Sequence, residues 1–384
     1  MSEITIVPAL DRAGVGAFIA AGARAQRDNP RWVEPLHEEF RMMFDARRAP
    51  LMRRHAIRPF VALRDGEPVG RIVATVDADH QAKHRDGCGF FGFVDAIDDP
   101  AVFAALFDAA EGFLRAQGMK MARGPFSLTI NFESGLLVDG FDQPHVIRTN
   151  HSPPHYARRI EALGYRKAID LVAYVCRVAE FEPARFERTL HGRIGSQLEF
   201  HRASLRTWRR DFSRILALYN DAWSDNLWAT PVSPEEAKFI ADLSLLACKP
   251  RWMQIARYRG EDVAVAVHIP DANEALQGLH GRLFPFGFAR FLWRVHVRGT
   301  KMTRAPMTGV ARKWRHTAVG AAAVSALIAR TIEDARAAGV EEIEYSWMLE
   351  TNTEALNGVR AIPAHYTRTF RIYERSLESM LRSG

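Results

Sequence analysis

A cationic turn before a long helical segment is the most distinctive chemical feature of the sequence. The turn carries Arg312, Lys313 and Arg315 and leads into AVGAAAVSALIARTIEDARA (318–337), whose small and apolar residues suit a helix. The first N–H groups of a helix have no partner within the helix, and its dipole places partial positive charge there. The turn therefore predicts a site for an anion such as a phosphate, or else an ordinary solvated basic turn.

An acidic turn before another helical segment has the opposite charge. The string FVDAIDDPAVFAAL (93–106) contains Asp95, Asp98 and Asp99. Asp-Asp-Pro is a favourable helix start, because aspartate caps free N–H groups and proline suits the first turn. Three carboxylates repel an anion, so we expect the C-terminal turn alone to bind one.

A carboxylate and an amide follow the apolar segment EYSWML (344–349). The tryptophan and methionine of this segment would partly remove Glu350 from water, which raises a carboxyl pKa and suits a general base. The alternative is that Glu350 faces solvent and that Asn352 and Glu354 cap a helix beginning near residue 353. The sequence leaves both interpretations open.

The cysteines and the N-terminus indicate the compartment. Cys88, Cys176 and Cys248 are far apart, odd in number and without the Cys/His spacing of a zinc site, so we expect neither a disulfide framework nor a metal site. Residues 1–10 lack a basic segment, and the longest apolar run, Ala318–Ala329, has only 12 residues. We therefore expect a cytoplasmic protein without a signal peptide or membrane span.

The charge balance narrows the class of partner. The 384 residues include 52 Lys and Arg against 45 Asp and Glu, a formal net charge of +7, and 47% are hydrophobic. This composition is typical of a soluble protein with two or three domains, and its sign favours phosphates, nucleic acid or an anionic membrane. The arginines alternate with long aliphatic residues and no nucleic-acid motif is present, so nucleic acid is the least favoured partner.

Three ordered segments recur in the two halves of the chain. They are a strand and helix at 4–32 and 198–228, a hairpin at 60–77 and 254–271, and a helix ending in glycine at 104–118 and 323–339. The hairpin strings, FVALRDGEPVGRIVATVD and QIARYRGEDVAVAVHIPD, align without gaps and share a turn glycine between β-rich runs. This ordered recurrence indicates an internal duplication.

The repeated order predicts an α+β protein of two tandem domains, each a mostly antiparallel twisted sheet flanked by helices. We place the N-terminal domain at 1–178, a linker at 179–197 and the C-terminal domain at 198–384. The alternative fold, a doubly wound nucleotide-binding sheet, requires repeated βαβ units and a G-x-G-x-x-G turn. Neither is present.

The element order, with an anion-binding turn between a strand and its helix, resembles the GNAT acyltransferase superfamily. The superfamily signature is Arg or Gln, two residues, Gly, one residue, and Gly or Ala, and the aligned residues here are Arg315, Ala318 and Gly320. Alanine thus replaces the first glycine, where backbone N–H groups approach the pyrophosphate. The resemblance implies an acyl-thioester site in the C-terminal copy and a degenerate one in the N-terminal copy.

Longer strings extend the resemblance over nearly the whole chain. They resemble a bacterial family of tandem GNAT proteins that includes the ceramide synthases, which acylate the amino group of a sphingoid base. The strings are NPRWVEPL (29–36), GPFSLTINFESGLLVDGFDQP (124–144), NHSPPHYARRIEALGYRKAIDL (150–171), GRLFPFGF (281–288) and SWMLETNTEALN (346–357). The resemblance implies an N-acyltransferase with acyl-CoA or acyl carrier protein as donor and a lipid or sphingoid-type amine as acceptor.

The resemblance also implies roles for individual residues. Glu350 is the expected base, with Asn352 beside it. Tyr373 or Tyr345 is the expected proton donor to the leaving thiolate, because Val359 stands where many relatives carry a tyrosine. The thioester carrier is expected along the strand and turn, at Val310, Ala311, Arg312, Arg315, Thr317, Ala318, Val319 and Gly320.

Polar residues of the N-terminal copy could add to this site. Asn131 and Glu133 of SLTINFE (127–133) align with the polar residues of MLETNTE in the second copy. They face the acceptor amine if the halves share a cleft, and otherwise they are a relic helix cap. His151 and His155 could supply a base or could be surface loop residues.

Two segments rich in aromatic, methionine and arginine side chains bear on the acceptor. GRLFPFGFARFLWR (281–294) and EFRMMFDARRAPLMRRHAIRPF (39–60) could line a hydrocarbon tunnel, lie on an anionic membrane or pack into a core. We expect an amphipathic amine and peripheral contact with an anionic membrane. The rival functions are a non-catalytic GNAT-like binding protein and an acetyltransferase acting on a small amine or a protein.

Overall fold

The computed structural model describes residues 3–184, 186, 192–244 and 247–378. They form two compact units, each assembled from separate stretches of the chain. Unit 1 takes the residues up to 171, then 276–283, and finally those from 368 onward, whereas unit 2 takes 172–275 and 284–367. The predicted domain bounds, which describe the duplicated sequence, stay a prediction.

Unit 1 is built on a mixed sheet with the strand order β1-β2-β3-β4-β5-β13. Its ladders are antiparallel except for the parallel pair of β4 and β5, and β6 pairs with β13. Its strands are β1 (Ile4–Pro8), β2 (Ala56–Arg64), β3 (Glu67–Val76), β4 (Cys88–Ala96), β5 (Met121–Gly124) and β6 (Leu136–Asp139). Its helices are α1 (Arg12–Ala25), α2 (His37–Met43), α3 (Pro50–Arg54), α4 (Ala78–His84), α5 (Pro100–Ala116) and α6 (His155–Ala162).

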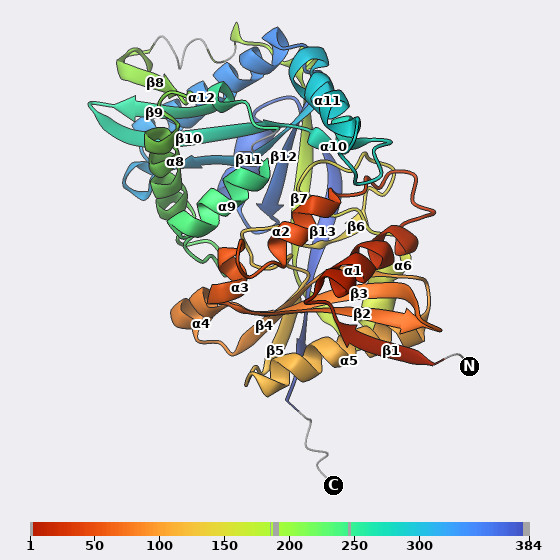
Figure 1. Ribbon diagram of the computed structural model, residues 1–384. Helices are drawn as coiled ribbons and strands as arrows, with labels where there is room; N and C mark the ends of the chain where they lie inside the picture. The colour runs from red at the N-terminus through yellow and green to blue at the C-terminus, as the bar shows by residue number, and fades with distance from the viewer. Residues whose placement is uncertain (1–2, 185, 187–191, 245–246, 379–384) are drawn as a thin grey trace. The chain divides into compact units, whose positions relative to one another are not determined.

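Helices α1 and α5 cover opposite faces of this sheet (Figure 1). Side chains alternate between the two faces along β3. Ile72 therefore packs into the core with Phe103 and Leu106 of α5. Arg71 points the other way and donates to the Phe18 carbonyl oxygen of α1.

Unit 2 repeats this plan with the strand order β12-β11-β10-β9-β8, in which only β11 and β12 form a parallel ladder. Its strands are β8 (Leu198–Arg202), β9 (Met253–Tyr258), β10 (Glu261–Pro270), β11 (Met302–Val310) and β12 (Glu342–Leu349). Its helices are α8 (Trp208–Ala222), α9 (Pro234–Ser244), α10 (Ala272–Leu276), α11 (Gly287–Leu292), α12 (Ala318–Ala337) and α13 (Thr353–Arg360), with a π-helix at Trp293–Arg298.

Helices α8 and α12 lie on opposite faces of the unit 2 sheet (Figure 1). Val310 at the end of β11 packs with Ala323 and Leu327 of α12. The adjacent Gly309 faces the other way, where its missing side chain leaves room for the Trp223 ring at the end of α8. In the part of the chain that the structure describes, no helix is both long and apolar enough to cross a membrane.

The two predicted hairpins are both present and have the same turn. The φ angles are 52° and 82° at Asp65 and Gly66, and 50° and 82° at Arg259 and Gly260. Positive φ at both central residues defines a type I′ turn, which fits the twist of a two-residue hairpin and favours glycine. The predicted strand and helix that open each half are also present. The predicted fold class is confirmed.

Two long strands contribute residues to both units: β7 (Arg166–Arg177) and β13 (Ala364–Ser376). The second half of β13 pairs with β5, and Tyr373 stands opposite Gly124. The end of the C-terminal sequence copy thus completes the sheet of unit 1.

Candidate active site

The parallel strands of unit 2 diverge halfway along their length. Their ladder runs from the pair Met302 and Glu342 to the pair Ala305 and Tyr345. Among the described residues it stops there, although β11 continues to Val310 and remains paired with β10 on its other edge. The backbone groups of 306–310 that face β12 are therefore an unpaired strand edge, which suits an extended ligand with amide groups.

The N-terminus of α12 lies at the open end of this strand pair. Thr317 is the N-cap, and its hydroxyl accepts from the Gly320 N–H at 3.1 Å. Ala318 is the first helical residue and is not among the residues with positive φ, so alanine fits where the superfamily has glycine. The N–H groups of Ala318 and Val319 point out of the first turn, where an anion binds well.

The tight turn before α12 requires glycine at position 320. A Cβ atom there would lie 2.1 Å from the Trp314 carbonyl oxygen, so the turn itself excludes a side chain. The Gly320 N–H is already used by the Thr317 cap and is not directed to a pyrophosphate. The tight turn brings the end of β11 and the start of α12 together, and the cofactor-binding role of Gly320 stays a prediction.

The cations of the turn are each paired with an acidic side chain. Arg312 pairs with Asp221 at 3.3 Å, Arg315 with Asp225 at 3.1 Å, and Lys313 with Glu261. The acids come from α8, from the turn that follows it and from the β9–β10 hairpin, and the anion site stays a prediction. Exposed pairs of this kind contribute only about 0–1 kcal/mol, so a phosphate can replace a carboxylate partner.

A buried polar cluster lies where the two strands begin to diverge. Arg304 and Glu344 are register partners on β11 and β12. Arg304 donates from Nε to the Ser346 hydroxyl at 2.9 Å, and that hydroxyl donates to the Glu344 carboxylate at 2.6 Å. The Arg304 guanidinium also lies 4.3 Å from the centroid of the Trp347 ring. These contacts hold both strands at the point of divergence.

The sequence reasoning did not identify this cluster. The available signal was the alternation of Glu344 and Ser346 with apolar Ile343 and Tyr345. In a strand with one wet face this alternation predicts solvent-exposed polar residues, but here both faces are buried. The partner Arg304 is 40 or more residues away, so local patterning could not reveal the pairing.

The predicted acid–base residues follow β12. Glu350 is exposed because the strand ends at Leu349, so the predicted desolvation by Trp347 and Met348 is wrong. Asn352 is the N-cap of α13, and its side chain accepts from the Ala355 N–H at 3.0 Å. The helix-cap interpretation of Asn352 is thus confirmed, and the base role of Glu350 stays a prediction.

Neither candidate tyrosine lies on an open surface. Tyr345 is buried in the core between the unit 2 sheet and α12, and burial raises the pKa of its hydroxyl. Tyr373 is buried in unit 1, where its hydroxyl donates to Glu161 at 2.9 Å. Burial and then Glu161 raise the pKa of Tyr373. Both are placed as core tyrosines, and the proton-donor role stays a prediction.

The first-copy residues occupy a different structure from their second-copy counterparts. Asn131 and Glu133 lie in a turn closed by the bridge between Phe126 and Ser134, so neither a strand end nor a helix cap is present. Glu133 pairs with Arg148 at 3.6 Å. Burial lowers the pKa of Arg148, but its carboxylate neighbours outweigh this effect and raise it. The expected structural equivalence is therefore wrong, and Glu133 supports the fold of unit 1.

The corresponding opening in unit 1 is filled by the chain itself. The β4–β5 ladder ends at Phe90 and Arg123, and the Phe126 N–H then donates to the Phe91 carbonyl oxygen at 2.7 Å. A Cβ atom on Gly92 would lie 2.0 Å from the Phe126 carbonyl oxygen, so the two backbones are in direct contact. No space for an extended ligand remains between these strands.

The acids of the first-copy turn have structural partners. Asp95 is buried and pairs with Arg71 at 2.6 Å. Asp99 caps α5 through the Ala101 N–H and also pairs with Arg64. These contacts use the carboxylates to hold α5 and the sheet together, and the absence of an anion site at this turn stays a prediction.

Two bacterial proteins are similar to this chain over nearly its whole length. The chain is 33% identical over 377 residues to the bacterial ceramide synthase of Caulobacter vibrioides, which covers 98% of both chains. It is 34% identical over 371 residues to the protein YghO of Escherichia coli, which covers 96% of this chain and 94% of that protein. The chain belongs to the family of the bacterial ceramide synthase. No protein-family model matches it.

The fold of this ceramide synthase relative also matches solved tandem structures. A tandem GNAT protein from the clavulanic acid biosynthesis pathway aligns with a TM-score of 0.58 and 13% identity over 98% of this chain and 99% of that one. A GCN5-related N-acetyltransferase from Sphaerobacter thermophilus aligns with a TM-score of 0.53 and 12% identity, covering 97% and 96%. At these identities the likeness shows the fold alone.

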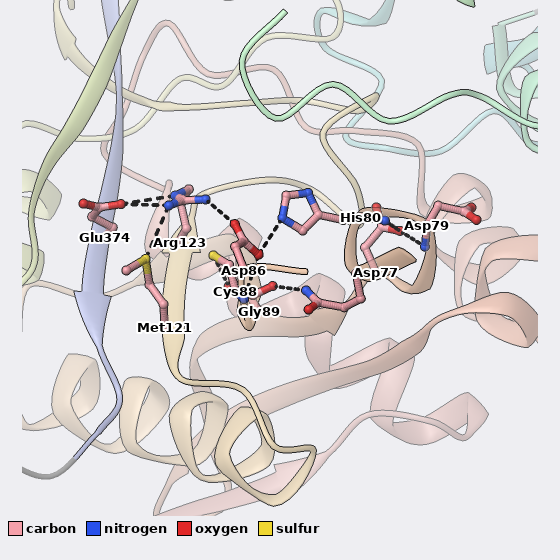
Figure 2. A network of polar contacts seen from close by, with 10 residues as sticks. Asp77, Asp79, His80, Asp86, Cys88, Gly89, Met121, Arg123 and Glu374 are labelled. Carbon is pink, nitrogen blue, oxygen red and sulfur yellow. Dashed lines mark hydrogen bonds and ion pairs between the residues drawn. The ribbon is translucent and has the colours of Figure 1, made fainter. Parts of the chain in front are cut away.

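In this family member, a chain of polar contacts crosses unit 1 near the end of β5. Figure 2 shows Glu374, Arg123, Asp86 and His80 in a row, with Arg123 between two carboxylates. The distances are 3.0 Å from Arg123 to Glu374, 3.4 Å from Arg123 to Asp86 and 3.0 Å from Asp86 to His80. Burial lowers the pKa of His80. The network ties α4 and β5 to β13.

One group in the described part of unit 1 has the composition of a metal site. Ligand atoms of His55, Asp77 and Asp79 lie within 4.8 Å of one another. However, the Ala78 N–H donates to His55 Nδ1 at 3.1 Å, Asp77 caps α4, and Arg54 pairs with Asp79 at 2.6 Å. Each of the three residues thus already has a protein partner through at least one atom, and the prediction of no metal stays a prediction.

The loop histidines of the first copy are structural or only partly exposed. His151 is buried, accepts or donates at both ring nitrogens, and contacts Asn29 and the Gln143 carbonyl oxygen. Burial lowers its pKa to about 4. The surface interpretation of His151 is wrong, because the loop folds over it. His155 is half-buried at the start of α6.

Proposed function

We propose that this protein is an N-acyltransferase that moves an acyl group from a coenzyme A thioester to the amino group of an amphipathic, sphingoid-type amine. The observation that carries the proposal is the diverging strand pair of unit 2 beside the N-terminus of α12. The name of the Caulobacter relative supports an amine acceptor that yields a ceramide. An acyl carrier protein is the other candidate donor, because it carries the same pantetheine thioester.

The donor would bind along β11 and the following turn. Its pantetheine amides would pair with the free edge at 306–310, ending near Val310 and Ala311. Its pyrophosphate would accept from the Ala318 and Val319 N–H groups at the helix start. The remaining members of the proposed donor site are Arg312, Arg315, Thr317 and Gly320, which provide charge, the helix cap and the tight turn.

The chemistry is a simple exchange at the thioester carbonyl carbon. The amine nitrogen forms a bond to this carbon, the carbon–sulfur bond breaks, and the thiolate leaves. Glu350, at the open end of β12, would take the amine proton directly or through one water molecule, and Asn352 would hold the adjoining turn. The thiolate would receive its proton from solvent or from a tyrosine, for which Tyr373 remains the proposed donor.

The proposal also includes the compartment, which is the cytoplasm. None of the three described cysteines is in a disulfide, and the substrate amine would be produced and consumed on the cytoplasmic face of the membrane. Contact with that membrane would be peripheral.

The test is a reconstituted acylation. Purified protein, palmitoyl-CoA and a series of amino alcohols of increasing chain length are incubated, and amide and free CoA are measured by mass spectrometry. We expect equal amounts of amide and CoA, with efficiency that rises several-fold per added methylene, because each buried methylene is worth about 0.8 kcal/mol. Equal rates with short polar amines or peptide N-termini would instead favour an acetyltransferase of small or protein substrates.

Glu350→Gln tests the base in the same assay. Loss of a general base lowers turnover by about 10²–10⁴-fold, and CoA binding should persist. Glu354→Gln is the matched control, since that exposed carboxylate lies in the next turn and pairs with His316. Equal rates for both variants would remove Glu350 from the mechanism.

The ion-paired cations of the turn favour a second candidate, a non-catalytic binding protein. Thermal unfolding with and without CoA separates the two. A ligand that binds only the folded state raises the melting temperature. Stabilisation by CoA without any amide from the amine series would support the binding protein.

A further inference from the structure

The aromatic run of unit 2 divides into an inner and an outer set. Phe291 is 2% exposed and packs into the unit, together with the buried Val295. The outer set is defined by its exposure, which is far above that of most apolar side chains here. Its members are Phe284 at 80%, Phe286 at 84%, Trp293 at 53% and Val297 at 73%, hereafter the outer aromatic patch. The core interpretation of this run therefore holds only for its inner residues.

Helix geometry places the patch on one side of its element. Phe286, Trp293 and Val297 are seven and four residues apart along α11 and the π-helix that continues it, so they share a face. Phe284 extends this face and stacks on Phe288, with ring centroids 6.1 Å apart and planes inclined by 4°. Exposed apolar side chains gathered in this way mark an interaction surface rather than scattered surface residues.

The sequence segment that carries the patch has charge of one sign. Residues 275–332 contain ten Lys or Arg and no Asp or Glu. Arg290 and Arg298 lie on the same exposed segment, and neither forms an ion pair with any described residue. The turn cations Arg312 and Arg315, by contrast, are compensated by acids from elsewhere in unit 2. Positive charge therefore remains uncompensated beside the exposed rings.

Acidic lipid headgroups combine the two properties that complement this surface. Aromatic rings enter the boundary between headgroups and acyl chains, and arginines remain among the phosphates. A negative bilayer attracts nearby cations over about a Debye length. A protein partner would have to supply both an apolar pocket for several rings and acidic groups around it.

We propose that the outer aromatic patch, with Arg290 and Arg298, docks unit 2 onto an anionic lipid bilayer. The proposal rests on the proposed function in one respect, since it identifies the bilayer as the source of the long-chain amine. Such an amine has its chain in the membrane and its amino group at the surface. Docking would present that amino group to the protein without releasing the chain into water.

The experiment measures sedimentation of the full-length protein with vesicles of phosphatidylcholine alone or mixed with phosphatidylglycerol. The protein should bind the anionic vesicles and lose binding as salt rises. Phe286→Ser with Trp293→Ser should reduce binding at least about tenfold, because burying one aromatic ring is worth that much or more. Arg290→Ala with Arg298→Ala should reduce it roughly tenfold, on anionic vesicles only.

Leu205→Ser is the matched control. Leu205 is 78% exposed, belongs to unit 2 and is followed by exposed Arg206 and Arg209, but it lies outside the patch. It should bind vesicles like the unmodified protein. Circular dichroism and thermal unfolding should be alike for all variants, because every substituted side chain is exposed.

The outcomes separate this proposal from the proposed function. With a detergent-dispersed amine, Phe286→Ser with Trp293→Ser should acylate at the unmodified rate. Vesicle binding without any acylation would support the docking surface and contradict the assignment as an enzyme. Absence of vesicle binding, an equal loss in Leu205→Ser, or a patch-dependent dimer in sedimentation would overturn the docking surface, whatever the acylation assay gives.

Discussion

The openings between the parallel strands of the two units differ in what fills them. In unit 1, β5 is short and the chain turns back, so that the Phe126 backbone contacts Phe91 and Gly92. In unit 2, β12 is twice as long, and its ladder with β11 stops at Ala305 and Tyr345. The two units share one fold, but one parallel strand pair is closed and the other is open. A few residues at the strand ends make this difference.

The turns that follow show the same division of roles. Asp95 of unit 1 is buried against Arg71, a contact that serves packing. Arg312 and Arg315 of unit 2 are in exposed pairs that a stronger anion can replace. The comparison teaches that the acidic turn of unit 1 uses its charges in packing, whereas the basic turn of unit 2 keeps its charges near water.

The largest effect should come from breaking the buried pair of unit 1. Asp95→Ala leaves the Arg71 guanidinium buried without its carboxylate, which costs about 3–5 kcal/mol of unfolding free energy. Denaturant unfolding measures this loss, and CoA binding by surviving folded protein should be unchanged. Asp98→Ala is the control, because its pair with Arg159 is exposed and should cost less than about 1 kcal/mol. Equal costs would contradict the structural role of Asp95.

The next largest effect should come from acid, which should destabilise unit 1 more than unit 2. Burial lowers the pKa of His145 to about 3 and of His151 to about 4, from 6.5. Below pH 6.5 the unfolded chain binds protons that the folded chain does not. The unfolding free energy of unit 1 should therefore fall by up to about 1.4 kcal/mol per pH unit for each histidine as the pH falls. Above pH 6.5 this contribution is fully present.

Proteolysis at pH 7 and pH 5, with fragments assigned to each unit by mass spectrometry, measures that difference. In the described part of unit 2, His268 is the corresponding residue, with burial lowering its pKa to about 3. Burial also lowers the pKa of His55, His80 and His155 in unit 1, so we expect unit 1 to be cleaved first. Earlier cleavage of unit 2 would contradict the assignment of this pH dependence to the buried histidines of unit 1.

A smaller effect should follow from filling the tight turn of unit 2. Gly320→Ala forces its Cβ atom against the Trp314 carbonyl oxygen. Overpacking costs about 1–3 kcal/mol, so the CoA affinity should fall by about 5- to 150-fold in calorimetric titration. Gly112→Ala on α5 is the matched helical control, since nothing lies within 4 Å of its Cβ position. An unchanged CoA affinity in Gly320→Ala would show that the turn is not part of the proposed donor site.

The smallest effect concerns the helix caps. Asn352→Ala and Asp11→Ala each remove one N-cap hydrogen bond, in unit 2 and unit 1, and each should cost about 1 kcal/mol. Turnover should fall by less than about tenfold in Asn352→Ala and remain unchanged in Asp11→Ala. A far larger loss of turnover in Asn352→Ala, at equal stability, would show that its amide contacts the reacting groups.

Local signals predicted the elements of the fold. The Asp65–Gly66 and Arg259–Gly260 turns and the glycine-terminated helices follow from backbone preferences that act over a few residues. The fold class and the difference between the two turns could therefore be predicted before the structure was known.

Contacts between distant segments could not be predicted in this way. The acids that neutralise Arg312 and Lys313 are 91 and 52 residues away, and the closure of the unit 1 opening depends on two backbones touching at Gly92. The exposure of Glu350 depends on which side chains pack beside the end of β12 at Leu349, and the local sequence does not give that packing.

The pairing of β5 with β13 has a consequence for biosynthesis. Arg123 and its β13 partner Glu374 are 251 residues apart, so the edge of β5 has no partner strand until almost the whole chain has been made. At about 5–20 residues per second, the ribosome needs roughly 10 to 50 seconds to supply it. During that interval the nascent first half exposes an open sheet edge, which binds other strands readily. Folding of unit 1 therefore waits for the residues from 368 onward, and any stop or pause before residue 368 would be a trigger of aggregation in the cell.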